Sequence, residues 1–305
     1  MSGGSAGADL IPVICGPTAA GKSAIALSLA QRHGRSILVA DSRQVYRHFD
    51  VGTAKPSPAE RRLVPHAGLD LVPPTERYSA AHWAAFADDV LRGATSAPIV
   101  VGGTGMYLRA LFEGLFDDPS TDDDRREALA EWLDGRSTDE LRRWTERLDP
   151  GRARLGRTQL LRALSVSLLS GHRISDLHQT RATRSAWRPR YLVIDPGAAL
   201  HRQIEHRLDA MLAAGWLDEV RSLADLPDDA PAWKATGYRA LRDVARGAST
   251  QSSAREKILI ETRQYAKRQR TWFRHQLPDE LTTRVDPSAP DAADRISAWW
   301  STVTG

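Results

Sequence analysis

The segment Gly-Pro-Thr-Ala-Ala-Gly-Lys-Ser at 16–23 constrains the fold of this chain more than any other feature. It fits the pattern G-x-x-x-x-G-K-[ST] at every position, follows the apolar run Leu10–Cys15, and opens a helical pattern over Lys22–Arg32. Such a loop lets backbone N–H groups curl around phosphate oxygens at the positive end of a helix. Lys22 adds a point charge, and the Ser23 hydroxyl is a candidate Mg²⁺ ligand. The segment predicts a parallel α/β core that binds a phosphorylated ligand, and it leaves open whether that ligand is ATP.

Further apolar runs extend the α/β pattern. Strands are predicted over Leu10–Cys15, Ser36–Ala40, Pro98–Val101 and Tyr191–Ile194, and an Ala-rich helical pattern over Ser79–Leu91 precedes the third of them. Strands that alternate with helices indicate a parallel sheet covered on both faces. The expected core is therefore a parallel sheet like that of P-loop NTPases.

The middle and the end of the chain have a different pattern. No convincing strand is found over 116–189, where helical stretches are predicted at 124–133, 138–148 and 158–169. After the strand candidate at 191–194, helical patterns follow at 199–214, 217–223, 238–245 and 253–276. We predict an α/β core with an inserted all-helical domain and a helical C-terminal region, divided into 1–115, 116–189 and 190–305.

The composition excludes several classes of protein. With 41% hydrophobic and 26% charged residues, the chain is an ordinary globular protein and not a disordered one. Its single cysteine, Cys15, cannot form an intrachain disulfide, and its apolar neighbours predict a buried, inert thiol. No run approaches the roughly 18 apolar residues of a membrane span, and residues 1–9 do not resemble a signal peptide. We expect a soluble, cytoplasmic monomer. The net charge of +4 fits an anionic partner without requiring one.

Two polar segments follow predicted strands. Asp41 ends the run Ser36–Ala40 and is followed by Ser42-Arg43-Gln44, and the glycine turn 102–105 ends the run Pro98–Val101. Open α/β sheets bind ligands at the carboxyl ends of their strands. We therefore expect Asp41 at the site, although a turn cap is an alternative role for it and a plain strand-to-helix turn is an alternative for the glycines.

The last long helical pattern carries a cationic stripe. Four cations recur at i, i+4, i+7 and i+11, within about 60° of one another around the helix: Arg263, Lys267, Arg270 and Arg274. Aromatic residues interleave with them: Tyr265, Trp272 and Phe273. Phosphate contacts combined with stacking are typical of proteins that bind single-stranded nucleic acid. The alternative is a solvated charged face with the aromatic rings in the core.

Taken together, these motifs resemble the tRNA dimethylallyltransferase (tRNA isopentenyltransferase) family. The matching segments, in family order, are GPTAAGKS at 16–23, DSRQVYRHFDVGTAKP at 41–56, YSAA at 78–81, GGTGMY at 102–107, GYR at 237–239 and TRQYAKRQRTWFR at 262–274. The resemblance implies transfer of the dimethylallyl group of dimethylallyl diphosphate to N6 of the adenosine 3′ of the anticodon, position 37 of tRNA, with release of pyrophosphate. It also implies Mg²⁺ as cofactor and an insert that contacts the anticodon stem-loop.

The resemblance also assigns residues. Asp41 matches the base for the adenine amine, Thr18 approaches the bridging oxygen, and Arg207 binds pyrophosphate. The diphosphate-binding positions are Gly16, Pro17, Thr18, Ala19, Ala20, Gly21, Lys22 and Ser23, the last also a metal ligand. The tRNA-binding positions are Asp41, Ser42, Arg43, Gln44, Thr104, Arg126, Thr158, Gln159, Arg162, Lys234, Gly237, Arg263, Lys267, Arg268, Gln269, Arg270, Trp272 and Arg274.

Some positions depart from the family pattern. Only one histidine follows Pro65, the stretch Leu155–Arg157 is shorter than usual, and Gln159 stands where an arginine is often found. Three rival functions remain: an adenylate isopentenyltransferase acting on free AMP, ADP or ATP, a P-loop kinase or ATPase, and a non-enzymatic RNA-binding protein. The helical insert and the basic helix favour tRNA over a free nucleotide, and an RNA-binding protein would not need a phosphate loop.

Overall fold

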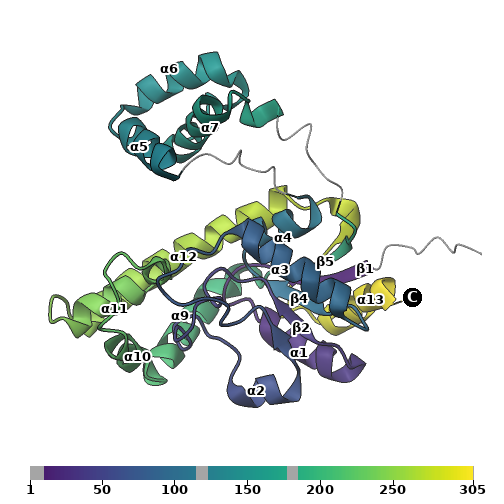
Figure 1. Ribbon diagram of the computed structural model, residues 1–305. Helices are drawn as coiled ribbons and strands as arrows, with labels where there is room; N and C mark the ends of the chain where they lie inside the picture. Colours follow the sequence, from purple (N-terminus) through teal and green to yellow (C-terminus); the bar gives the residue numbers. More distant parts are fainter. Residues whose placement is uncertain (1–9, 115–122, 177–184, 305) are drawn as a thin grey trace, which may run out of the picture. The chain divides into compact units, whose positions relative to one another are not determined.

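The computed structural model describes residues 10–114, 123–176 and 185–304 (Figure 1). Its contacts divide the chain into two units, one made of the residues up to Phe112 and from Ala186 onward, the other of Glu113–Ser185. The first unit contains the sheet, and every regular element described in the second is a helix. The limits predicted for the insert, 116 and 189, lie a few residues further along the chain than these.

The sheet is parallel throughout, with the strand order β3-β2-β4-β1-β5-β6. Its strands are β1 (Leu10–Cys15), β2 (Ile37–Val39), β3 (His66–Ala67), β4 (Ile99–Gly102), β5 (Arg188–Ile194) and β6 (Thr282–Val285). The four predicted strands are confirmed with shifts of a few residues. The sequence analysis did not predict β3 and β6, because β3 has two residues and three of the four residues of β6 are polar.

Alternating side chains of the strands divide the core into two layers. Val13 and Val193 point into one hydrophobic cluster, whereas Ile14 and Leu192 point into the other. Helices α1 (Lys22–His33) and α13 (Ala292–Thr304) cover the face of Ile14. The opposite face is covered by α3 (Ala80–Gly93), α4 (Gly105–Phe112) and the C-terminal part of α12 (Gln251–His275). The predicted sheet covered on both faces is confirmed.

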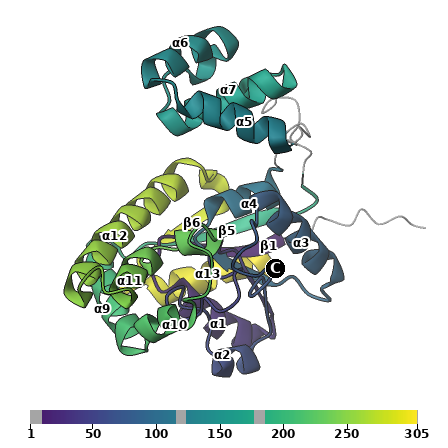
Figure 2. The same cartoon turned by 60° about the vertical axis from the view of Figure 1, so that its left-hand side comes forward.

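The C-terminal helices form a group beside the sheet. They are α9 (Leu200–Ala213), α10 (Trp216–Ser222), α11 (Tyr238–Ala245) and α12, and α12 lies along α9 and α11 (Figures 1 and 2). Short 3₁₀ helices occur at Pro150–Arg152, Gly197–Ala199, Pro231–Lys234 and Asp279–Leu281. No helix in the described part of the chain is both long and apolar enough to cross a membrane.

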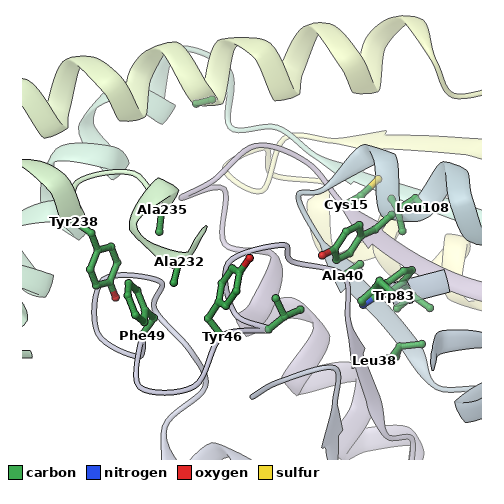
Figure 3. Close-up of a cluster of buried hydrophobic side chains, with 14 of the residues drawn as sticks. Cys15, Leu38, Ala40, Tyr46, Phe49, Trp83, Leu108, Ala232, Ala235 and Tyr238 are labelled. Carbon is green, nitrogen blue, oxygen red and sulfur yellow. The ribbon is translucent and has the colours of Figure 1, made fainter. Parts of the chain in front are cut away.

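An aromatic contact joins the segment after β2 to this helical group. The ring of Phe49 lies 4.5 Å from that of Tyr238 and 5.4 Å from that of Trp233. Figure 3 shows Phe49 beside Tyr238, with Cys15 and Trp83 at the far end of the same buried cluster. This packing holds the segment that follows Asp41 against the start of α11 and the 3₁₀ helix before it.

The second unit is a small helical bundle. It contains α5 (Asp123–Asp134), α6 (Thr138–Leu148) and α7 (Arg157–Ser170), each close to its predicted range. Its core consists of four leucines, Leu133, Leu141, Leu160 and Leu164. At the start of α6, Ser137 and Glu140 form a capping box, which satisfies the first free N–H groups of the helix.

Three helices of the first unit were not predicted. They are α2 (Pro58–Leu63), α4 and α13. Helix α2 has no buried residue and is stabilised instead by a capping box between Ser57 and Glu60. An element without an apolar stripe gives no periodic signal to detect.

Candidate active site

The phosphate loop, residues 16–23, joins β1 to α1 as the motif predicted. Gly16 has φ +141°, and a Cβ there would lie 2.2 Å from the carbonyl oxygen of Ile194, so only glycine fits. Gly21 has φ +85° at the N-cap of α1. Lys22 folds back and donates from Nζ to the carbonyl oxygen of Pro17 at 2.6 Å. The loop is therefore preformed, with its lysine resting on its own backbone.

Two buried groups near the loop have shifted pKa values. Burial, with the positive charge of Arg207 as the second cause, lowers the pKa of Lys22 to about 8. Asp41 acts in the opposite direction. Burial raises the pKa of the Cys15 thiol to about 12, so the predicted buried and inert cysteine is confirmed.

The low pKa of Lys22 predicts a pH dependence for anion binding. Below about pH 8 the free lysine is charged, and above it the charge is lost unless a bound anion restores it, so affinity for inorganic pyrophosphate should fall by up to about tenfold per pH unit above pH 8. Titration calorimetry between about pH 7 and pH 9 measures this. Lys22→Arg is the control. Its guanidinium stays charged, so the loss of affinity caused by deprotonation of Lys22 should disappear. An equal fall of affinity with pH in both proteins would contradict the assignment of this effect to Lys22.

The loop opens into a large cleft that meets a small pocket. The cleft has a volume of about 1160 Å³ and includes Lys22, Ser23 and Gln269 in its lining. The small pocket has a volume of about 80 Å³. Six residues line both: Thr18, Ala19, Asp41, Arg207, Met211 and Tyr265. The three residues predicted as catalytic thus come from three separate elements to the junction of the two cavities.

Backbone hydrogen bonds hold Asp41 in place. One carboxylate oxygen accepts the N–H of Arg43 at 2.8 Å and that of Gln44 at 3.4 Å. The N–H of Ser42 donates to Oγ1 of Thr104 at 3.0 Å, which links this segment to the glycine turn after β4. Asp41 therefore caps a turn and also lines both cavities, and its role in the reaction stays a prediction.

Arg207 and Tyr265 lie near the carboxylate of Asp41, in the lining of both cavities. Burial lowers the pKa of Arg207, and Asp41 acts in the opposite direction. Burial, and secondarily the charge of Asp41, raises the pKa of Tyr265 to about 12, so its hydroxyl is neutral. The sequence analysis named Tyr265 only as an interleaved aromatic. Its signal was the spacing of Thr262, Tyr265 and Gln269 at i, i+3 and i+7, which places all three on the cavity side of α12.

The predicted cationic stripe on α12 divides into two kinds of residue. Lys267 and Arg274 are exposed, as is the neighbouring Arg268, which is not part of the stripe. Arg270 instead donates from Nε to Oδ2 of Asp195 at 2.8 Å, and Arg263 forms a 3.9 Å ion pair with Glu205. Two of the four cations of the stripe are therefore paired with acidic side chains, and the binding of tRNA by the stripe stays a prediction.

Three other residues predicted to bind tRNA make contacts within the protein itself. Gln44 is 9% exposed and donates to the carbonyl oxygens of Thr53 and Ala54. Gly237 has φ +90°, and a Cβ there would lie 2.4 Å from the Trp216 ring. Trp272 covers the backbone of Gly105, where a Cβ would lie 2.4 Å from its ring. Of these three, Gln44 lines the large cleft, whereas Gly237 and Trp272 contact other parts of the first unit.

The remaining predicted contacts lie elsewhere on the surface. Lys234 is exposed in the 3₁₀ helix before α11. Thr158, Gln159 and Arg162 are exposed on α7 of the helical unit. Arg126 belongs to α5, but its side chain lies outside the described ones.

The fold and the site define a P-loop-type α/β protein whose phosphate loop adjoins a small pocket. Comparison with known proteins agrees and is more specific. A family profile described as IPP transferase matches residues 44–276, and one described as Isopentenyl transferase matches 10–64. The tRNA dimethylallyltransferase of Stenotrophomonas maltophilia is 42% identical over 284 residues, covering 87% of this chain and 89% of the relative. That of Deinococcus radiodurans is 40% identical over 301 residues, covering 94% and 95%. The chain belongs to the tRNA dimethylallyltransferase family.

Solved structures support this assignment. The tRNA isopentenylpyrophosphate transferase of Staphylococcus epidermidis superposes with a TM-score of 0.69 at 26% identity, covering 96% of this chain and 99% of that one. The full-length enzyme of Bacillus halodurans gives 0.66 at 27% identity, covering 98% and 100%. A eukaryotic dimethylallyltransferase acting on tRNA shares the fold, with a TM-score of 0.76 at 24% identity and coverage of 95% and 77%. The predicted family, enzyme class and fold class are confirmed, whereas the roles of single residues stay predictions.

Proposed function

We propose that this chain transfers the dimethylallyl group of dimethylallyl diphosphate to N6 of the adenosine 3′ of the anticodon, position 37 of tRNA, and releases pyrophosphate. The observation that carries the proposal is the meeting of Thr18, Asp41 and Arg207 where the large cleft joins the small pocket. An anion-binding loop, a base and a partly buried cation are the groups that such a transfer needs.

The reaction breaks the bond between allylic C1 and the bridging oxygen, and the electron pair stays on pyrophosphate. Lys22, Arg207 and the loop N–H groups stabilise this growing negative charge. A new bond forms between C1 and N6 of adenine, whose lone pair is delocalised and weakly nucleophilic. Asp41 accepts the N6 proton as this bond forms. An unpaired loop adenosine reaches the site at lower cost than one in a duplex.

The small pocket suits the hydrocarbon part of the donor. Its apolar walls come from α9, α10 and α12 and consist of Ile204, Leu208, Met211, Trp216 and Ile258. The pocket is much smaller than the cleft, and its apolar walls suit a short branched hydrocarbon chain. This favours a prenyl diphosphate over ATP as the ligand of the phosphate loop.

The residues at the loop also fit Mg²⁺. Ser23 presents a hydroxyl in the first turn of α1 and lines the large cleft. Among the described residues, no group of three His, Cys, Asp or Glu side chains could hold a metal alone. The ion would therefore bind through Ser23 and the oxygens of the substrate, as Mg²⁺ commonly does. When bound, it would neutralise charge on the diphosphate.

One assay separates this function from its rivals. The protein is incubated with labelled dimethylallyl diphosphate and, in turn, with unmodified tRNA, AMP or ATP. We expect label only in tRNA and no hydrolysis of ATP. Label in AMP or ATP would favour an adenylate isopentenyltransferase, and tRNA-stimulated ATP hydrolysis would favour a kinase or ATPase.

The exposed cations of α12 should contribute to tRNA binding. We propose that Lys267, Arg268 and Arg274 contact phosphates, so Lys267→Ala with Arg274→Ala should lower the log–log salt slope of tRNA binding by about 0.7–0.9 per contact. The KM for dimethylallyl diphosphate should stay unchanged. Filter binding across a salt series measures the slope, and Lys257→Ala, at an exposed lysine in the N-terminal part of α12, is the control. A slope equal to that of the wild type would show that these cations are only a solvated face.

The helical unit is proposed to hold the anticodon stem-loop through Thr158, Gln159 and Arg162 on α7, with Arg126 on α5. In the first unit, Ser42, Arg43 and Thr104 are proposed to contact the RNA beside Asp41. We further propose that the enzyme works as a monomer in the cytoplasm, where its tRNA substrate is found.

A further inference from the structure

Gln269 lies in α12 beside the exposed cations, yet only 7% of it is exposed. Its side-chain amide forms two hydrogen bonds to other elements. Oε1 accepts the N–H of Thr18 in the phosphate loop at 2.8 Å, and Nε2 donates to the carbonyl oxygen of Gly103 in the glycine turn at 2.9 Å. One amide thus joins the helix to the ends of two neighbouring strands, β1 and β4.

The space around the side-chain amide of Gln269 is closely filled. A Cβ at Gly103 would lie 2.3 Å from Nε2 of Gln269 and 3.4 Å from the carbonyl oxygen of Gly16, so the amide and the loop fill the space next to the turn. Among uncharged side chains, only glutamine combines one donor and one acceptor on a stem of this length. Both partners of the amide are backbone groups in partly or fully buried places. Without Gln269, each would lose this hydrogen bond.

The hydrogen bond to Gln269 also limits the other contacts that Thr18 can make. Because its N–H is occupied by Gln269, Thr18 has only its hydroxyl and carbonyl left for other partners, and the residue lines both the large cleft and the small pocket. The next residue, Arg270, is bound to Asp195 at the end of β5. Two consecutive residues of α12 therefore hold the carboxyl ends of three strands, β4, β1 and β5.

From this geometry we infer that Gln269 is a positioning residue, which sets Thr18 and the glycine turn relative to each other, and that it does not bind tRNA. The inference rests on the proposed function. It replaces the tRNA contact that the family resemblance implies for this position. A misplacement of about 1 Å at reacting groups can cost on the order of 10²-fold in rate. The expected effect is therefore on kcat and not on the KM for tRNA.

The test compares Gln269→Met and Gln269→Asn with the wild type. Methionine keeps the volume and removes both hydrogen bonds, whereas asparagine keeps the amide on a stem too short to reach both partners. Gln264→Met, at an exposed position of the same helix, is the control. Steady-state kinetics should show kcat lowered by on the order of 10²-fold in both Gln269 variants, with the KM for tRNA within about twofold of the wild type.

Two results would overturn the inference. One is a raised KM for tRNA with kcat within about threefold of the wild type, which is what an RNA contact predicts. The other is a lower Tm with unchanged kcat at a temperature where the variants are folded, which is what a purely structural contact predicts. Absence of transfer by the wild-type chain would instead contradict the proposed function, so the two failures are distinguishable.

Discussion

Asp41→Asn is expected to lower the rate of dimethylallyl transfer by about 10²–10⁴-fold, the usual contribution of a general base. Asparagine keeps an oxygen that can accept the N–H groups of Arg43 and Gln44, so the local backbone should persist. The amide cannot take the proton that N6 loses when its bond to C1 forms. Single-turnover transfer with saturating tRNA measures the effect, and the Kd for tRNA should change little.

The control for this variant is Asp89→Asn, which removes an exposed carboxylate from α3 outside both cavities. It should transfer at the wild-type rate. If Asp41→Asn also stays within about threefold of the wild type, Asp41 is not the base. Its carboxylate would then serve only as a turn cap.

Lys22→Ala is expected to weaken transition-state stabilisation by about 2.7–4 kcal/mol, which is about 10²–10³-fold in rate. In the free enzyme the ammonium donates to the carbonyl oxygen of Pro17, and it must leave this partner to reach the diphosphate. Removing it leaves the loop N–H groups and Arg207 to stabilise the leaving group. Arg32→Ala, at an exposed position in the last turn of α1, is the matched control. A Lys22→Ala protein with wild-type kcat and wild-type KM for dimethylallyl diphosphate would contradict this role.

The sequence predicted the elements that have a strong apolar pattern. Strand β1 was predicted at Leu10–Cys15 and α6 at Thr138–Leu148, which are their observed bounds. Strand β1 is a continuous apolar run because helices cover both faces of the sheet, and Leu141 and Leu148 recur at helical spacing in α6. In contrast, β3 has two residues and α2 packs no buried side chain, so neither leaves a pattern in the sequence.

The site could be predicted only in part for a different reason. The phosphate loop is local, so its conformation follows from consecutive residues. The pairing of Arg270 with Asp195 joins residues 75 positions apart, and the bond from Gln269 to Thr18 spans 251 positions. Spacing along one helix places these side chains on a face but does not say what that face meets in the fold.

The most direct test of the proposed function is to locate the transferred group. An unmodified anticodon stem-loop is incubated with the protein, Mg²⁺ and dimethylallyl diphosphate, and its nucleosides and fragments are analysed by mass spectrometry alongside released pyrophosphate. The proposed function predicts one added C₅H₈ unit on N6 of the adenosine at position 37, matched by one pyrophosphate, and no product when that adenosine is replaced by guanosine. Addition at another nucleoside, or modification of free AMP or ATP in preference to the stem-loop, would contradict it.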